Sequence, residues 1–281
     1  LSVQNKLKAN SQPLIISAHL DTVFPLDMDL KAKRDDDKVY GIGIGDNSMG
    51  VAALVGLIWL LRERRFDFAN TPLSATNNDI WFVANVGEEG LGDLRGMKAV
   101  VDRFGSNVFA YLVLEGLALG HVYHRAIGVR RYRITAKTAG GHSWADYGQP
   151  SAVHELAALV TQLIAIRLPR NPRTTMNVGT FGGGTGVNVL ASEAKCELDL
   201  RSEDPKALMK LVHQVEKMLK DADREGVRVM AEIIGERPAG EIPADHPLVD
   251  LAVKCAREQG LEAILTIGST DANIPLSCGI P

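Results

Sequence analysis

The sequence has few cysteines, no long apolar run and no excess of one charge, and each absence excludes a class of protein. Its cysteines, Cys196, Cys255 and Cys278, are odd in number and lack both the pairing of a disulfide framework and Cys/His metal-site spacing. They indicate reduced thiols and a cytoplasmic protein. The longest apolar run, 51–61, is shorter than the roughly 18 residues of a membrane-spanning helix. The polar opening, LSVQNKLKAN, has no signal-peptide pattern.

The balance of charge also limits the partners. Thirty-one Lys and Arg residues against 34 Asp and Glu residues give a net charge of −3, so electrostatics provide no reason to expect nucleic acid or an anionic membrane. The local cluster of Arg125, Arg130, Arg131 and Arg133 is typical of a solvated strand face. With 281 residues, 46% of them hydrophobic, the chain can form one large core or two smaller ones.

A glycine-rich segment, GIGIGDNSMG at 41–50, precedes an apolar run and invites comparison with phosphate-binding loops. The dinucleotide fingerprint G-x-G-x-x-G fails, because the third glycine position falls on Asp46 or Ser48. A P-loop would need a lysine that is not there. Asp46 would repel a phosphate where a helix N-terminus should attract it. A nucleotide-binding oxidoreductase is therefore disfavoured, and we expect Asp46 to serve another purpose.

The first part of the chain alternates short apolar strands with helices. Strands are predicted at 13–18, 38–42, 79–86 and 109–114, with a helix from about Ser48 to Arg64. This order indicates an α/β fold with a mostly parallel sheet flanked by helices. Ligands of such sheets bind at the carboxyl ends of the strands, and four predicted strands or strand–turn units place polar or acidic residues at this edge.

The pattern changes near residue 126. Strand, helix, strand, strand, helix and strand are predicted at 128–138, 151–166, 175–181, 194–201, 205–223 and 227–234, which is the order of a βαββαβ ferredoxin-like domain. We therefore divide the chain into a first part of a metal-binding domain (1–125), an inserted domain (126–236) and a second part of the first domain (237–281). The helix and strand of the last part are expected to rejoin the first sheet.

The residues at the predicted sheet edge suggest a metal centre. His19, Asp46, Glu89 and Glu115 combine one imidazole with three carboxylates, which repel one another unless cations neutralise them. This donor set suits two divalent ions, most readily zinc, with cobalt or manganese as alternatives. A carboxylate shared by two ions is the usual arrangement for activating water against a carbonyl. Asp46 is the natural bridge, because its glycine-rich loop permits close backbone approach.

Two further acids fit this centre. Glu88, beside Glu89, would act as general base on a water molecule at the metal, and Asp21 would orient His19 or its metal as an outer carboxylate. Taken singly, each of these features has an ordinary explanation, since isolated HxD motifs and Glu–Glu pairs are common on solvated surfaces. Their occurrence together at successive strand ends is the more specific signal.

A resemblance extends through almost the whole chain. The segments SAHLDTVFP, GIGIGDNSMGVAAL, VGEEGLGDLRG, LEG, GGHS, NVGTFGGGTGVNVLASEAKCELDLRS and GSTDANI resemble, in order, the blocks of the co-catalytic zinc amidohydrolases and exopeptidases. That family includes carboxypeptidase G, acetylornithine deacetylase, succinyl-diaminopimelate desuccinylase, peptidase T and aminoacylase. The resemblance implies a dinuclear zinc enzyme that hydrolyses an amide bond in a small peptide or N-acyl amino acid.

Transferred residue by residue, the resemblance implies the same metal site. His19 and Glu115 bind one zinc, Glu89 binds the other and Asp46 bridges them. Glu88 stands at the position of the base and Asp21 at that of the residue orienting His19. Glutamate at position 115 favours the carboxypeptidase and deacylase branch.

The resemblance also implies substrate contacts and a homodimer formed through the inserted domain. His142 would reach across the dimer to polarise the scissile carbonyl, where a hydrogen-bond donor stabilises the developing oxyanion. Asn188 and Arg201 would contact substrate, and a loop comprising Gly268, Ser269, Thr270 and Asp271 would face its terminal carboxylate. The ordinary alternatives are a turn histidine, an ion pair of Arg201 with Glu203 or Asp204, and an exposed turn.

The printed sequence departs from the family in one respect. A fifth metal ligand, a histidine, should follow the GSTDANI block, but the sequence stops at Pro281. We expect a longer chain, cut at both ends, with this histidine beyond Pro281. The alternative is a degenerate, non-catalytic protein of the same fold that binds metal or a small molecule.

Overall fold

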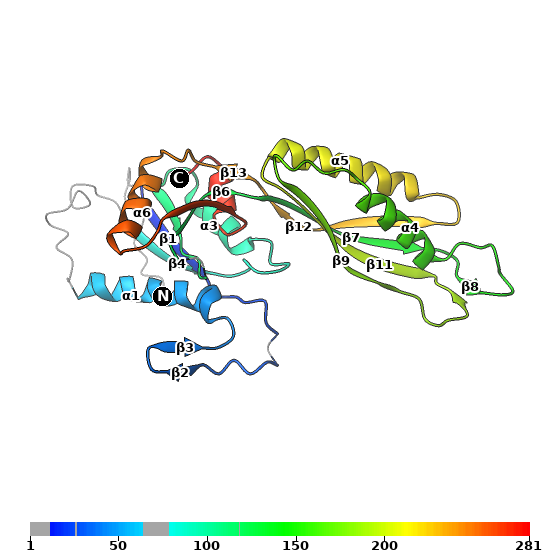
Figure 1. Ribbon diagram of the computed structural model, residues 1–281, viewed down its shortest axis with the longest axis horizontal. Helices are drawn as coiled ribbons and strands as arrows, with labels where there is room; N and C mark the ends of the chain where they lie inside the picture. Colours follow the sequence, from blue (N-terminus) through cyan, green and yellow to red (C-terminus); the bar gives the residue numbers. More distant parts are fainter. Residues whose placement is uncertain (1–11, 26, 64–78, 118) are drawn as a thin grey trace. The chain divides into compact units, whose positions relative to one another are not determined.

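The computed structural model describes residues 12–25, 27–63, 79–117 and 119–281 (Figure 1). By its internal contacts the chain forms two compact units. The first unit comprises Leu1–Ala126 with Gly240–Pro281, and the second comprises Ile127–Ala239.

The centre of the first unit is a parallel sheet. Strand β1 (Leu14–His19) lies between β4 (Ile80–Asn85) and β5 (Ala110–Val113). Successive side chains of β1 point to opposite faces. Ile15 packs with Met97 of helix α3 (Arg95–Phe104), whereas Ile16 and Ala18 pack with Leu54 of α1 (Met49–Arg62). The apolar run of β1 thus arises from burial on both faces, and the predicted α/β class is confirmed.

The strand predicted at 38–42 is not part of this sheet. Residues Lys38–Tyr40 form β3, which pairs antiparallel with β2 (Lys33–Asp35) in an isolated hairpin. Asp36 has φ 53° at the turn, a left-handed conformation that Asp tolerates and tight hairpins use. Asp46 therefore reaches the site from a loop, and the expectation of a parallel strand before it was wrong.

A second sheet of the first unit contains β6 (His121–Ala126), β13 (Gly240–Glu241) and β14 (Ile264–Gly268). Helix α6 (Pro247–Glu258) precedes β14, and the short α7 (Asn273–Ser277) follows it. Strand β14 pairs in parallel with β6. Among the described strands it has no partner in the β1 sheet, so the expected return to that sheet was wrong. The sequence of β6, HVYHRA, is polar and was not predicted to form a strand, so the partner of β14 was not foreseen.

One segment of the described residues, Ile44–Arg62, is long and apolar enough by composition to cross a membrane, with a mean hydropathy of 1.6. Its beginning, Ile44–Ser48, is irregular, because Asp46 has φ −121° and ψ 100°. The regular helix α1 spans 14 residues, or about 21 Å. We assign the segment to the fold, because Leu54 packs against β1. The helix predicted from Ser48 is confirmed; its predicted end, Arg64, lies outside the described residues.

The second unit has the predicted βαββαβ order. Its elements are β7 (Gly128–Lys137), α4 (Ala152–Ile164), β9 (Thr174–Gly183), β11 (Glu193–Ser202), α5 (Pro205–Ala222) and β12 (Arg228–Arg237). The strands form an antiparallel sheet in the order β12-β7-β11-β9. Both helices pack on one face, around a core that includes Ile134, Leu156, Leu198 and Val215. Short strands β8 (Gly141–His142) and β10 (Val189–Leu190) pair separately.

The arginines of β7 pair with acids on neighbouring strands. Arg130 contacts Glu236 at 2.6 Å, Arg131 contacts Asp199 at 2.8 Å, and Arg133 contacts Glu197 at 3.0 Å. These cross-strand pairs balance the charge of the three arginines locally. The expectation of one solvated strand face was wrong in two respects: Arg130 and Arg131 are mostly buried, and Arg125 lies on β6 of the first unit.

Candidate functional site

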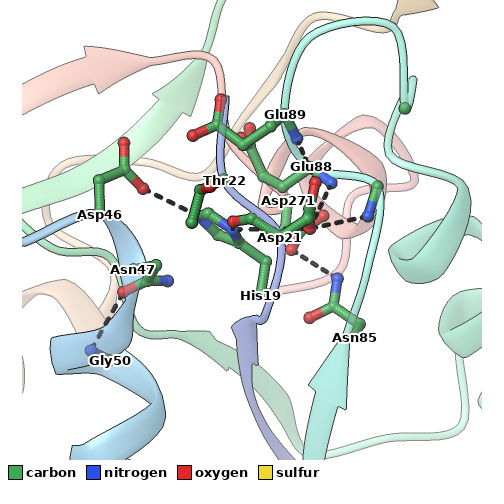
Figure 2. A network of polar contacts seen from close by, with 12 residues as sticks. His19, Asp21, Thr22, Asp46, Asn47, Gly50, Asn85, Glu88, Glu89 and Asp271 are labelled. Carbon is green, nitrogen blue, oxygen red and sulfur yellow. Dashed lines mark hydrogen bonds and ion pairs between the residues drawn. The ribbon is translucent and has the colours of Figure 1, made fainter. Parts of the chain in front are cut away.

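His19 lies at the carboxyl end of β1 and its side chain is only 1% exposed. Nδ1 is 2.9 Å from the carbonyl oxygen of Asp21, which can only accept a hydrogen bond, so Nδ1 carries a proton. Nε2 faces two carboxylates. It lies 3.1 Å from Asp46 Oδ1 (Figure 2) and 3.6 Å from Glu115 Oε2. Burial alone would lower the pKa of His19, but the Glu115 and Glu88 carboxylates and the Asp21 carbonyl raise it to about 9.

Asp46 is carried by the glycine-rich loop, which packs closely against the segment that follows β5. A Cβ atom on Gly116 would lie 1.4 Å from the carbonyl oxygen of Gly45, and one on Gly45 would lie 2.2 Å from the Leu117 side chain. Gly43 has φ 70°. The glycines therefore let the loop of Asp46 approach the loop of Glu115, instead of cradling a phosphate.

The next residue, Asn47, fixes this approach. Its side chain is 1% exposed, donates to the carbonyl of Leu114 at 2.8 Å and accepts from the backbone N–H of Gly50 at 3.1 Å. Leu114 directly precedes Glu115. Asn47 thus connects the loop of one metal-binding candidate to the strand end of another.

Glu88 and Glu89 follow β4, on the other side of β1. Glu88 is 7% exposed, which is unusual for a glutamate. The backbone N–H groups of Gly87, Glu88 and Glu89 all donate to the carboxylate of Asp21. That carboxylate lies 3.7 Å from His19 Nδ1, farther than the Asp21 carbonyl that holds the ring.

Two groups of side chains place their ligand atoms within 4.8 Å of one another: His19 with Asp46 and Glu115, and His19 with Glu88 and Glu89. Buried atoms at their centre, His19 Nε2, Asp46 Oδ1 and Glu115 Oε1, have no hydrogen-bond partner among the described residues. Buried polar atoms normally have partners. The arrangement of bare donor atoms around an imidazole is that of a cation site.

A buried acid, Asp271, lies close to these candidate metal-binding residues. Asp271 is fully buried and accepts a hydrogen bond of 2.6 Å from Asn85, at the end of β4. Burial raises the pKa of Asp271 to about 6, with the nearby Glu115 carboxylate contributing in the same direction. Asp271 directly follows the half-buried loop of Gly268, Ser269 and Thr270. The Asn273 side chain accepts from the Thr270 N–H at 2.9 Å and fixes this loop.

The remaining predicted residues belong to the second unit. His142 pairs with Val189 between β8 and β10, beside Asn188, whose carbonyl accepts from the Ser143 N–H at 3.0 Å. Nδ1 of His142 accepts from the N–H groups of Trp144 and Ala145, which leaves Nε2 as the outward donor. Arg201, on β11, donates to Asp199 at 2.7 Å, not to the acids considered from the sequence.

Two protein-family models match this chain. The profile of peptidase family M28 matches residues 2–146, and the M20 peptidase dimerisation domain matches residues 126–227. The chain belongs to the M20/M28 group of metallopeptidases. It is 26% identical to a peptidase M20 domain-containing protein of Schizosaccharomyces pombe (85% of this chain, 56% of the relative) and 25% identical to a probable carboxypeptidase of Arthroderma otae (83% and 53%). The chain spans about half the length of these relatives.

A solved structure supports the fold of this metallopeptidase. A tripeptidase from Staphylococcus aureus superposes with a TM-score of 0.75 at 24% identity, covering 97% of this chain and 72% of the tripeptidase.

The residues present fit a divalent cation. Imidazole and carboxylate donors suit zinc, cobalt or manganese, and the partnerless buried atoms converge on one point. The group of His19, Asp46 and Glu115 could hold one ion. Glu89 lies on the opposite side of His19, with Glu88, and could contribute to a second.

Sequence reasoning missed two polar residues of the metallopeptidase site, Asn47 and Asn85, and assigned Asp271 to the substrate loop without its buried place close to Glu115 and His19. Asn47 directly follows Asp46, and Asp271 lies within the GSTDANI segment, so their positions offered a signal. Asn85 offered none, because its role depends on a contact with a residue 186 positions away.

Proposed function

We propose that this metallopeptidase hydrolyses an amide bond in a small peptide or N-acyl amino acid. The observation that carries the proposal is the convergence of His19, Asp46 and Glu115, beside a second group with Glu88 and Glu89. The buried donor atoms of the first group have no hydrogen-bond partner in the part of the chain that the structure describes. The names of the relatives, a probable carboxypeptidase and a tripeptidase, support this substrate class.

Each residue has a proposed task. His19 and Glu115 would hold one ion and Glu89 the other, and Asp46 would be shared between them. The ions, most readily zinc, supply Lewis acidity toward the scissile carbonyl and toward water. Glu88 accepts a proton from the attacking water and passes it to the leaving amine. Glu88 is buried beside the other candidate residues, where it is shielded from bulk solvent.

Substrate recognition is assigned to two regions. The loop of Gly268, Ser269 and Thr270 faces the terminal carboxylate of the substrate, where hydroxyl groups are suitable donors. His142 of the partner subunit would offer its Nε2–H across a homodimer to the scissile carbonyl, a role supported by the two N–H groups that occupy Nδ1. Asn188 and Arg201 contact the remainder of the substrate.

We further propose a homodimer through the second unit. The outer side of α4 presents Ala157, Ala158, Thr161, Gln162 and Ile164, which are exposed and uncharged. Among the described strands, β9 is an edge of its sheet, so one row of its backbone groups has no strand partner there. An uncharged helix face beside a free strand edge suits a second copy of the same surface. The three free cysteines support a reducing, cytoplasmic location.

The proposal is tested by a hydrolysis screen of the intact protein over N-acyl amino acids, dipeptides and tripeptides. The protein is first stripped with a chelator and then supplied with Zn²⁺, Co²⁺ or Mn²⁺. We expect hydrolysis that disappears on chelation and returns with metal. Stoichiometric metal binding without hydrolysis of any substrate would instead indicate the non-catalytic binding protein.

A further inference from the structure

The carboxylate of Asp21 lies against the loop that carries Glu88 and Glu89. Oδ1 accepts from the N–H of Gly87 at 2.8 Å and of Glu88 at 3.3 Å, and Oδ2 accepts from the N–H of Glu89 at 2.9 Å (Figure 2). Three successive backbone donors converging on one anion form a nest. Burial alone would raise the pKa of Asp21, but these hydrogen bonds lower it, so the carboxylate is ionised.

The same carboxylate is not required to hold His19. The imidazole Nδ1 is 2.9 Å from the backbone carbonyl of Asp21, whereas the nearer carboxylate oxygen is 3.7 Å away. Any residue at position 21 supplies that carbonyl. The side chain and the backbone of Asp21 therefore act on different neighbours.

Asp21 lies where the backbone pairing of β1 with β4 ends, so a side chain has to bind the backbone that follows β4. The pairing of β1 with β4 continues to the bond from the Leu20 N–H to the Asn85 carbonyl, at 2.9 Å. Beyond it, the Asp21 carboxylate accepts from the amides that follow β4. Gly87 has φ 84°, and a Cβ there would lie 2.7 Å from the Arg95 side chain. The other side of the loop is closed by the bond from the Leu94 N–H to the Gly87 carbonyl, at 2.8 Å.

We propose that Asp21 is a positioning residue for the Glu88–Glu89 loop: its carboxylate fixes the backbone from which both side chains project, while only its carbonyl orients His19. The loop contact stands on geometry, and its consequence for catalysis rests on the proposed function. A displacement of the base by about 1 Å can cost 100-fold in rate. Substituting outer residues of metal sites typically costs about 10–100-fold.

The test compares Asp21→Asn and Asp21→Ala with the exposed control Asp37→Asn. Hydrogen exchange is followed by mass spectrometry with fragmentation, to resolve the amides of 87–89. We expect both Asp21 variants to accelerate exchange at Glu89 at least about 10-fold, because neither keeps both acceptor oxygens. Exchange in β1 and in β7 should be unchanged. If Asp21→Ala unfolds, the result for Asp21→Asn decides.

A second readout separates loop positioning from orientation of His19. Zn²⁺ affinity, measured by calorimetry, should change less than about 3-fold for the ion bound by His19, whereas kcat falls about 10–100-fold with KM nearly constant. Unchanged exchange at 87–89, or loss of that ion with the loop intact, would overturn the proposal. If the wild-type protein hydrolyses nothing, the proposed function fails, but the exchange result still decides the role of Asp21.

Discussion

His19 Nε2 lies 3.1 Å from Asp46 Oδ1, although one residue ends a buried strand and the other comes from a glycine-rich loop. Glu115 stands 3.6 Å from the same nitrogen. The Glu115 carboxylate favours the protonated ring, whereas a metal ion would need the same nitrogen deprotonated. Proton and metal therefore compete for His19.

This competition predicts proton release on metal binding. The pKa of His19 is raised to about 9, so the ring is protonated at pH 7, and a metal ligand must be neutral. Titration with Zn²⁺ in buffers of different ionisation enthalpy should show release of about one proton from His19. Affinity should weaken as the pH falls below 9. The exposed control His213→Asn should behave as wild type, whereas a binding enthalpy independent of the buffer would contradict the prediction.

Substitution of the proposed bridge should remove both ions together. In Asp46→Asn the side chain loses its charge and one of its two acceptor oxygens, so it cannot hold two cations. Metal content, measured by plasma mass spectrometry after dialysis, should fall for both sites, while Asp37→Asn retains both. Loss of a single ion would show that Asp46 is an ordinary ligand.

The stability of the second unit should depend on Asp199, and the size of this contribution should change with pH. Burial alone would raise the pKa of Asp199, but hydrogen bonds from Arg201 and Arg131 lower it. Its stabilisation is therefore present above the unfolded pKa of 3.8 and is lost as the pH falls through the lower folded value. Asp199→Asn should lower the free energy of unfolding by about 1–3 kcal/mol at pH 7.

Urea denaturation of wild type, Asp199→Asn and the exposed control Asp221→Asn at pH 7, 5 and 3 measures this effect. The deficit of Asp199→Asn should shrink only at the lowest pH. A deficit that stays constant from pH 7 to 3 would mean that the ion pairs do not stabilise this unit.

The proposed dimer can be broken on α4. Ile164 is 64% exposed on the uncharged side of the helix, so Ile164→Glu should cost little stability in the monomer but should place two like charges in a symmetric interface. Light scattering should show a dimer for wild type and a monomer for the variant. Lys210→Glu on α5 is the matched control, and dissociation of both variants alike would exclude α4 as the interface.

The site was largely predictable because it follows strand ends. His19, Glu88 and Glu115 each follow an apolar run, and the carboxyl ends of parallel strands meet at one edge. Asp46 was foreseen from the failed phosphate motif, although it arrives by a loop and not from a parallel strand. The βαββαβ order of the second unit was equally visible, because its helices have strong apolar periodicity.

The features that were not predicted leave no periodic pattern of apolar residues in the sequence. Strand β6 is polar, so nothing marked it as the partner of β14. Asn85 contacts Asp271 across most of the chain, and the Asp21 carboxylate binds backbone amides, which any sequence provides. Such contacts depend on which segments the fold brings together, so they are seen only in the structure.

The proposed role of Glu88 as the base at a metal centre can be decided by the turnover of a single variant. In the intact protein, kcat of Glu88→Gln is compared with that of wild type and of the exposed control Glu225→Gln at equal metal content. Because the amide cannot accept the proton, kcat should fall at least about 100-fold while both ions remain bound. Turnover equal to wild type with the ions in place would contradict the account.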